Sequence, residues 1–186
     1  MIITAILRLF QIIFAAIVLA LSISLIRSQD YGTVAAQNYA AFTGGFGLLV
    51  ALMGVAAIFI EPLAGFIQAG ADALAALFFI AGGIAIAVML SGINCSSKSD
   101  SNQEKLINNK LTTGGCVRNN KGSETDCGFT HHGSSKNGQL DWLLGRCKEN
   151  SADAAFMLIS AVMCLGLGVM SLLALRRGGG RKGVIA

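Results

Sequence analysis

Cysteine is the residue type in this sequence that points most directly to chemistry. Four of the five cysteines lie in one polar segment, at Cys95, Cys116, Cys127 and Cys147. An even number of cysteines in a small glycine-rich segment is typical of disulfides, which persist in oxidising compartments. Of the three pairings that four cysteines allow, we predict Cys95–Cys147, because these two flank the neighbouring apolar runs, with Cys116–Cys127 closing a smaller loop. Cys164 lies in an apolar run, and we expect it to be a small packing residue.

A second candidate for chemistry is a pair of opposite charges, Arg8 and Asp72, each placed inside an apolar run. Charges inside a membrane are costly and usually face the interior of a helical bundle in pairs. The two residues lie at similar depths if both runs cross a membrane in the same direction, so we predict that they approach each other. The pair would fix the packing and register of two helices, or Asp72 would be a functional acid that holds a cation, a proton or a lipid headgroup. The alternative for Arg8 alone is that its side chain extends to lipid phosphate.

No combination of residue types predicts a catalytic or metal centre. The sequence has no serine or cysteine matched to a general base, no glycine-rich phosphate-binding loop and no zinc-ligand spacing. His131 and His132 are adjacent in a segment rich in turn-forming residues, and adjacent histidines rarely converge on one metal ion. We therefore predict no enzymatic activity, no metal and no cofactor. Asn94, followed by Cys95 and Ser96, matches the N-glycosylation sequon.

Four apolar runs must position these residues, and we predict that each is a membrane-spanning helix. They cover about residues 2–27, 38–60, 63–93 and 152–176, and about twenty apolar residues suffice to cross a bilayer. Glu61 and the single proline, Pro62, predict a tight turn between the second and third helices. The competing interpretation of the first run is a secretory signal peptide, whose apolar region normally spans only about 7–15 residues.

The composition predicts an all-α integral membrane four-helix bundle that forms a single domain over residues 1–186. Charged residues make up 13% of the chain, against roughly 25% in soluble domains. Most of these charges fall in residues 94–151, which we predict to be an extracellular, disulfide-bonded loop between the third and fourth helices. The net charge of +4 is modest and forms no basic stripe, so nucleic acid is not expected as a partner.

The distribution of basic residues predicts the orientation of the bundle. Four helices place both termini on one side, and the last helix is followed by a basic tail, residues 177–186. The basic residues at this end are Arg176, Arg177, Arg181 and Lys182. Basic residues near a membrane end favour the cytoplasm, so we predict that both termini are cytoplasmic. The same tail would attract anionic lipid, or it would serve only as a signal for orientation.

Short motifs in this framework resemble the MARVEL-domain tetraspan proteins, and within them the fungal non-classical export protein family. They are residues 59–64 (Phe-Ile-Glu-Pro-Leu-Ala) with Asp72 ten residues after the proline, residues 94–97 (Asn-Cys-Ser-Ser), and Arg146-Cys147 followed by residues 152–156. The insert that carries Cys116 and Cys127 departs from the shorter loop of that branch. The resemblance implies a plasma-membrane organiser that forms lateral domains and furrow-like eisosome compartments, responds to sphingolipids and takes part in unconventional export.

Three functional hypotheses follow. The first is a non-enzymatic scaffold that self-associates laterally as a homo-oligomer and contacts membrane lipids such as sphingolipid or sterol. Small residues in the second helix would serve this association, or they would only pack within one chain, since small residues let membrane helices approach closely. The second hypothesis is a small channel or transporter that uses Asp72. The third is an integral membrane enzyme, for which the sequence supplies too few catalytic groups.

Overall fold

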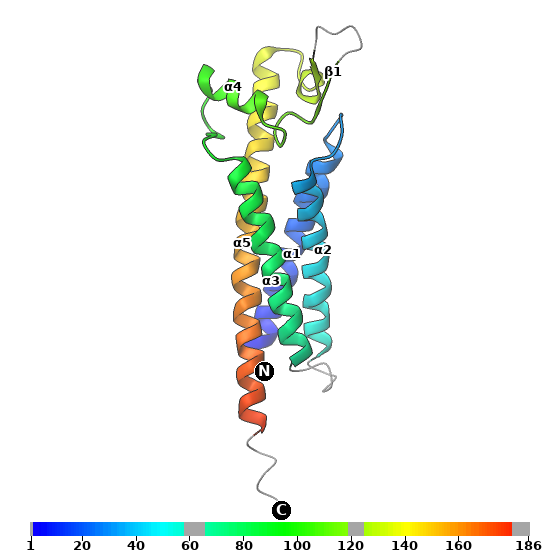
Figure 1. Cartoon of the computed structure of the whole chain (residues 1–186), viewed down its shortest axis with the longest axis vertical. Helices are drawn as coiled ribbons and strands as arrows, with labels where there is room; N and C mark the ends of the chain where they lie inside the picture. Colours follow the sequence, from blue (N-terminus) through cyan, green and yellow to red (C-terminus); the bar gives the residue numbers. More distant parts are fainter. Residues whose placement is uncertain (1, 58–65, 119–124, 180–186) are drawn as a thin grey trace, which may run out of the picture.

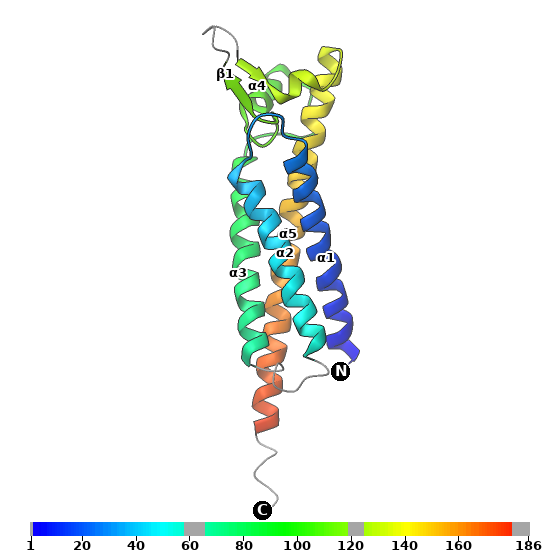
Figure 2. The same cartoon turned by 90° about the vertical axis from the view of Figure 1, so that its right-hand side faces the viewer.

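The core of the protein is a bundle of four long apolar helices. The computed structural model describes residues 2–57, 66–118 and 125–179. Its helices that are long and apolar enough to cross a membrane are α1 (Ile2–Arg27), α2 (Ala35–Ala56), α3 (Phe66–Met89) and α5 (Lys136–Gly179). They run side by side along the long axis of the molecule (Figures 1 and 2). At 1.5 Å per residue, even the shortest of them extends about 33 Å, which matches the hydrocarbon core of a bilayer.

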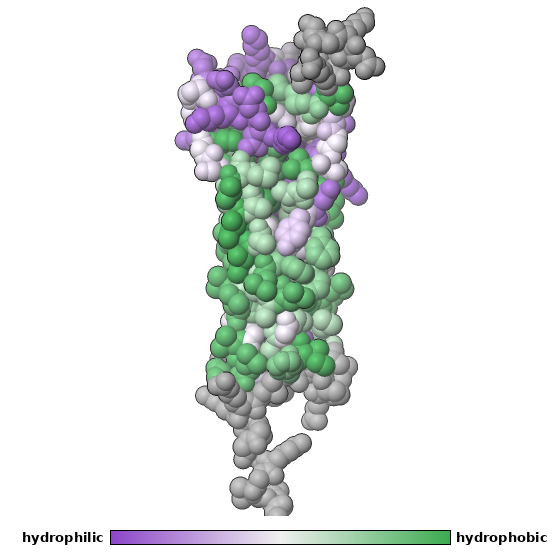
Figure 3. Space-filling model, in the orientation of Figure 1, coloured by the Kyte–Doolittle hydropathy of each residue, from purple (hydrophilic) through white to green (hydrophobic). Residues whose placement is uncertain are grey.

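The outer surface of the bundle is apolar. Leu49, Leu77 and Val162 leave 62%, 63% and 69% of their surface exposed. Hydrophobic side chains form a belt around the helices, whereas hydrophilic side chains gather at the end that carries α4 (Figure 3). A contiguous apolar surface of this size is rare in monomeric soluble proteins, and it is the surface that a helix bundle presents to lipid.

Glycine sets the distance between α1 and α2. A Cβ atom added at Gly44 would lie 2.7 Å from the backbone nitrogen of Leu19, so the two helices touch through their backbones at this point. Gly45, the next residue, has nothing within 4 Å of the same position. Close backbone approach replaces the hydrophobic driving force that helices lack inside lipid.

A compact polar region covers one end of the bundle. We call this region the cap and define it as residues 94–118 and 125–135. It contains α4 (Asp100–Asn108), the strands β1 (Cys116–Arg118) and β2 (Thr125–Cys127), and the 3-10 helix η2 (Gly128–His131). The strands form a two-stranded antiparallel sheet in which Cys116 lies opposite Cys127. The fold is therefore mostly helical, and the short hairpin is a departure from the predicted all-α class.

The bounds of the helices differ from the predicted ones most at α5. The predicted loop 94–151 is helical from Lys136 onward, and the predicted helix 152–176 lies within an unbroken helix of 44 residues. Inward-facing residues recur at helical spacing in the added turns, where Leu140, Leu143, Leu144 and Cys147 are all buried. The other long helices begin and end within a few residues of the predictions where the structure describes them. Glu61 and Pro62 lie outside the described residues.

Candidate functional site

The structure brings Arg8 of α1 and Asp72 of α3 together inside the bundle. The two guanidinium nitrogens Nη1 and Nη2 donate to the carboxylate oxygens at 2.7 and 2.6 Å, which is a bidentate ion pair. Arg8 is 2% exposed and Asp72 is fully buried. The arginine therefore points into the bundle rather than toward lipid phosphate. A paired arrangement is the expected state of charges at this depth, because an unpaired buried charge is strongly unfavourable.

Two glutamines complete the hydrogen bonding of the Asp72 carboxylate. The Nε2 atoms of Gln11 and Gln68 donate to Oδ1 and Oδ2, each at 3.3 Å. Each carboxylate oxygen therefore accepts two hydrogen bonds. Gln11 also accepts a hydrogen bond from Arg8 at 2.7 Å and donates to the sulfur of Cys164 on α5 at 3.1 Å. We call Arg8, Gln11, Gln68, Asp72 and Cys164 the polar cluster.

The polar cluster reaches all four long helices. Gln68 donates to the backbone oxygen of Val50 on α2 at 3.3 Å. A Cβ atom added at Gly54 of α2 would lie 2.5 Å from Arg8 Nε, so the α2 backbone covers the guanidinium group directly. One set of buried polar side chains thus connects α1, α2, α3 and α5. Arg8 Nε is the one atom of the cluster without a hydrogen-bond partner among the described residues. Because the other groups bond one another between helices, the polar cluster helps to specify how the helices align.

A second set of buried polar groups lies between α5 and the helix ends near the cap. Arg146 is 3% exposed and donates to the backbone oxygens of Leu25, Ser28 and Leu111, and it also bonds the Ser28 hydroxyl. Asn150 accepts a hydrogen bond from Gln37 of α2 at 3.0 Å. Sequence reasoning missed this set. The available signal was the spacing of Arg146, Asn150 and Asp153, which places them on one face of a helix.

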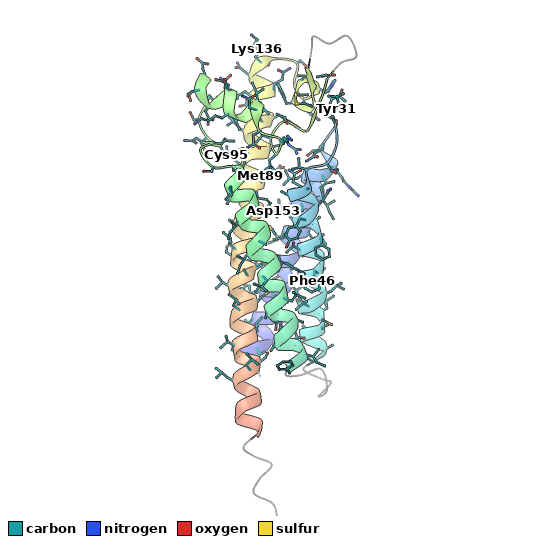
Figure 4. The ribbon with its side chains drawn as sticks, in the orientation of Figure 1. Tyr31, Phe46, Met89, Cys95, Lys136 and Asp153 are labelled. Atoms are coloured by element: carbon teal, nitrogen blue, oxygen red, sulfur yellow. A yellow bond between two sulfur atoms is a disulfide. The ribbon has the colours of Figure 1, made fainter. Side chains whose placement is uncertain are left out.

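One disulfide holds the cap to the bundle, and a second closes the hairpin within the cap. Cys95, just after α3, is bonded to Cys147 of α5, and Cys116 is bonded to Cys127 across the hairpin. The first bond spans 52 residues and joins the segment after α3 to the interior of α5, which begins at Lys136 and packs against α3. Figure 4 shows Cys95 next to the end of α3, close to Met89. Cys164 is the remaining cysteine, and it is buried and unbonded.

The link between α1 and α2 is fastened to the cap. The backbone nitrogens of Asp30 and Tyr31 donate to the backbone oxygen of Gly114 at 3.0 and 3.1 Å. The Tyr31 hydroxyl donates to Asp126 at 2.9 Å, and His132 lies 3.1 Å from Asp30. The hydrogen bond from Tyr31 lowers the pKa of Asp126, and the same bond raises the pKa of Tyr31. The polar link and the cap therefore form one connected surface.

The remaining predicted residues are placed as follows. Asn94 is exposed, and its side-chain oxygen accepts a hydrogen bond from the Ser96 backbone at 2.9 Å. Arg176 and Arg177 lie in the last turns of α5, where the structure does not describe side chains, and Arg181 and Lys182 lie outside the described residues. Within the ranges that the structure describes, no three His, Cys, Asp or Glu side chains are arranged to hold a metal ion.

Comparison with known proteins identifies the family. The model of the MARVEL membrane-associating domain matches residues 1–170, which include all four long helices up to the last turns of α5 and the whole cap. No curated protein and no solved structure shows significant similarity to the chain. The apolar four-helix bundle described above is what a membrane-associating domain requires. The chain belongs to the MARVEL membrane-associating domain family.

Proposed function

We propose that this protein is a non-enzymatic organiser of the plasma membrane, which associates laterally with copies of itself and helps to form membrane microdomains of the eisosome type. The observation that carries this proposal is the closed polar cluster. Asp72 is fully buried and bonded to Arg8, Gln11 and Gln68, so its carboxylate serves the alignment of helices. Membership of a membrane-associating family supports the same role.

The bonding of Asp72 within the polar cluster also argues against a channel or transporter. An acid that binds a moving ion must exchange its partners for that ion, and Asp72 would have to give up a bidentate arginine to do so. A cavity of about 570 Å³ lies between residues 31–34 and the cap, and Asp72 is not among its lining residues. The geometry of the acid thus favours a structural scaffold over a transport site.

The proposed orientation places the cap outside the cell and both termini in the cytoplasm. Two disulfides favour an oxidising compartment for the cap. The basic residues of the C-terminal tail favour the cytoplasm for the opposite end, because basic residues flanking membrane helices are retained there. The apolar belt of the bundle is the surface for lateral association and for contact with sphingolipid or sterol.

Imaging in native lipid tests this proposal. A fluorescent fusion of the whole chain should gather in stable plasma-membrane patches, and the protein purified in native lipid should form clusters of several copies. The decisive variant replaces both charges, Arg8→Leu with Asp72→Leu, which removes the acid without leaving its partner unpaired. If this variant folds and still forms patches, the acid supplies no chemistry that assembly needs. A wild-type protein that stays evenly dispersed, or one that conducts ions across vesicles, would reject the scaffold role.

A further inference from the structure

A second buried acid, Asp153 of α5, shares no hydrogen-bond partner with Asp72. It is fully buried and lies toward the capped end of the bundle (Figure 4). Its Oδ2 atom accepts a hydrogen bond from the Ser22 hydroxyl of α1 at 2.9 Å. Its Oδ1 atom is buried and has no hydrogen-bond partner among the described residues. A buried carboxyl oxygen without a partner is rare in native structures and requires an explanation.

No positive charge balances Asp153 within the described part of the chain. The ion pairs found there involve Asp72, Asp141, Asp126 and Asp30, but not Asp153. On its own helix the nearest charged groups are Lys148 and Glu149, which are both exposed. Arg146, one turn further away, is bound to backbone oxygens and the Ser28 hydroxyl.

The helices packed around Asp153 supply no partner either. On α1 the charged residues are Arg8, which is held by Asp72, and Arg27, which is exposed. The α2 sequence has no charged residue, and the only one in α3 is Asp72. Asp72 lies beside Gly168, which is fifteen residues further along α5 than Asp153. An ionised carboxylate at position 153 would therefore depend on a single hydroxyl donor.

The contrast with Asp72 shows what an ionised acid needs in this bundle. Asp72 has an arginine and four hydrogen bonds, whereas Asp153 has one hydrogen bond from a neutral group. A buried acid without a balancing charge avoids the cost of desolvation by taking up a proton. We propose that Asp153 is a proton-binding site, which holds a neutral carboxylic acid when α1 and α5 are closed against each other at this level.

Proton binding couples the packing of the capped half of the bundle to pH. Folding, which packs α1 against α5, takes one proton from solvent onto the Asp153 carboxyl, and unfolding returns it. The folded form therefore binds one more proton than the unfolded form. The ratio of folded to unfolded protein should fall by up to about tenfold for each pH unit above the ordinary titration range of an aspartate, until the buried acid itself ionises.

Infrared spectroscopy of the full chain in detergent tests this assignment. At neutral pH the wild-type protein should show the carbonyl stretch of one protonated carboxylic acid, and Asp153→Asn should abolish it. Asp141→Asn is the matched control, because Asp141 is an exposed acid paired with Lys98, and this change should leave the band intact. A wild-type protein without the band, or a band that survives Asp153→Asn, would overturn the proposal.

A second variant keeps the test independent of how well Asp153→Asn folds. Ser22→Ala removes the hydroxyl that donates to the acid, the one donor to it among the described residues, so the band should persist and shift in frequency. A band that does not move would show that it arises elsewhere and would reject the site. Thermal unfolding measured against pH gives a further check, since the wild-type midpoint should fall with rising pH more steeply than that of Asp153→Asn. Equal slopes of the two midpoints against pH would contradict proton uptake on folding.

Discussion

At the scale of single residues, the most consequential contact is the ion pair between Arg8 and Asp72. Asp72→Asn would leave the arginine charged and buried without its partner, and breaking a buried pair in this way typically costs about 3–5 kcal/mol. We expect a clear drop in the thermal unfolding midpoint of the detergent-solubilised protein. Arg8→Leu combined with Asp72→Leu should recover most of the loss, because no charge is then left uncompensated. An Asp72→Asn protein as stable as the wild type would contradict this account of the polar cluster.

The contact between Tyr31 and Asp126 predicts a dependence on acid pH. The pKa of Asp126 is lowered from 3.8 by the Tyr31 hydroxyl, so the ionised carboxylate favours the folded cap. This contribution is fully present above the unfolded pKa and is lost as the pH falls through the lower, folded one. Asp126→Asn should therefore reduce the unfolding midpoint at neutral pH, and its difference from the wild type should shrink as the pH falls below about 3.8.

A matched control distinguishes this contact from a general surface effect. Asp141 is also an acid of the capped end, but both it and its partner Lys98 are 60% exposed. Exposed pairs contribute little to stability, so Asp141→Asn should leave the midpoint nearly unchanged at every pH. If the unfolding midpoints of Asp126→Asn and the wild type differ by the same amount across the acid range, the Tyr31 contact does not depend on ionisation of Asp126.

At the scale of helices, the contact between α1 and α2 depends on one glycine. In Gly44→Ala the added methyl group would lie 2.7 and 2.9 Å from backbone atoms of Leu19, which cannot move aside as a flexible side chain would. Overpacking of this kind typically costs about 1–3 kcal/mol. The control is Gly45→Ala, which adds the same methyl group where nothing lies within 4 Å. We expect a reduced unfolding midpoint for the first variant only, and equal midpoints would contradict the close approach of the two backbones.

The two disulfides should differ in how much they stabilise the cap. In the chain-entropy description, closing 52 residues with Cys95–Cys147 is worth about 4 kcal/mol, and closing 11 with Cys116–Cys127 about 3 kcal/mol. Replacing both members of each pair by serine, in separate variants, should lower the unfolding midpoint more for the first pair. The first pair also joins α3 to α5, so its loss should expose the segment between α3 and α4 to limited proteolysis. A larger effect from the hairpin pair would contradict this order.

At the scale of the whole molecule, cysteine labelling tests the proposed orientation. An impermeant maleimide applied to intact cells should label Cys95, Cys116, Cys127 and Cys147 only after treatment with an external reductant. An Ala186→Cys variant supplies the matched control on the opposite side, and it should react only after the membrane is permeabilised. If the control is labelled in intact cells, or the cap cysteines only after permeabilisation, the orientation is the opposite of the one proposed.

Much of this architecture follows from patterns that are local in the sequence. Long apolar runs predict the four long helices, and the matched depths of Arg8 and Asp72 predict a contact that the structure contains. The glutamines of the polar cluster were harder to foresee, because an amide in an apolar run gives no sign of its partner. Gln11 and Gln68 acquire their role only when α1 and α3 are placed side by side.

The beginning of α5 could not be predicted from hydropathy alone. Residues 136–151 are polar on average, and this average conceals a buried face made by Leu140, Leu143 and Leu144. That face is stable because the cap packs against it, and the cap itself depends on contacts between residues far apart in the chain. Arg146 illustrates the point, since its acceptors on Leu25 and Ser28 lie more than a hundred positions away.

The unbroken course of α5 has a mechanical consequence. A helix of 44 residues extends about 66 Å, so one stiff rod reaches from the cap to the opposite end of the bundle. Cys147 anchors this rod to the end of α3 on the capped side, and the polar cluster holds it near Cys164. We therefore expect a displacement of the cap to tilt or rotate the far end of α5.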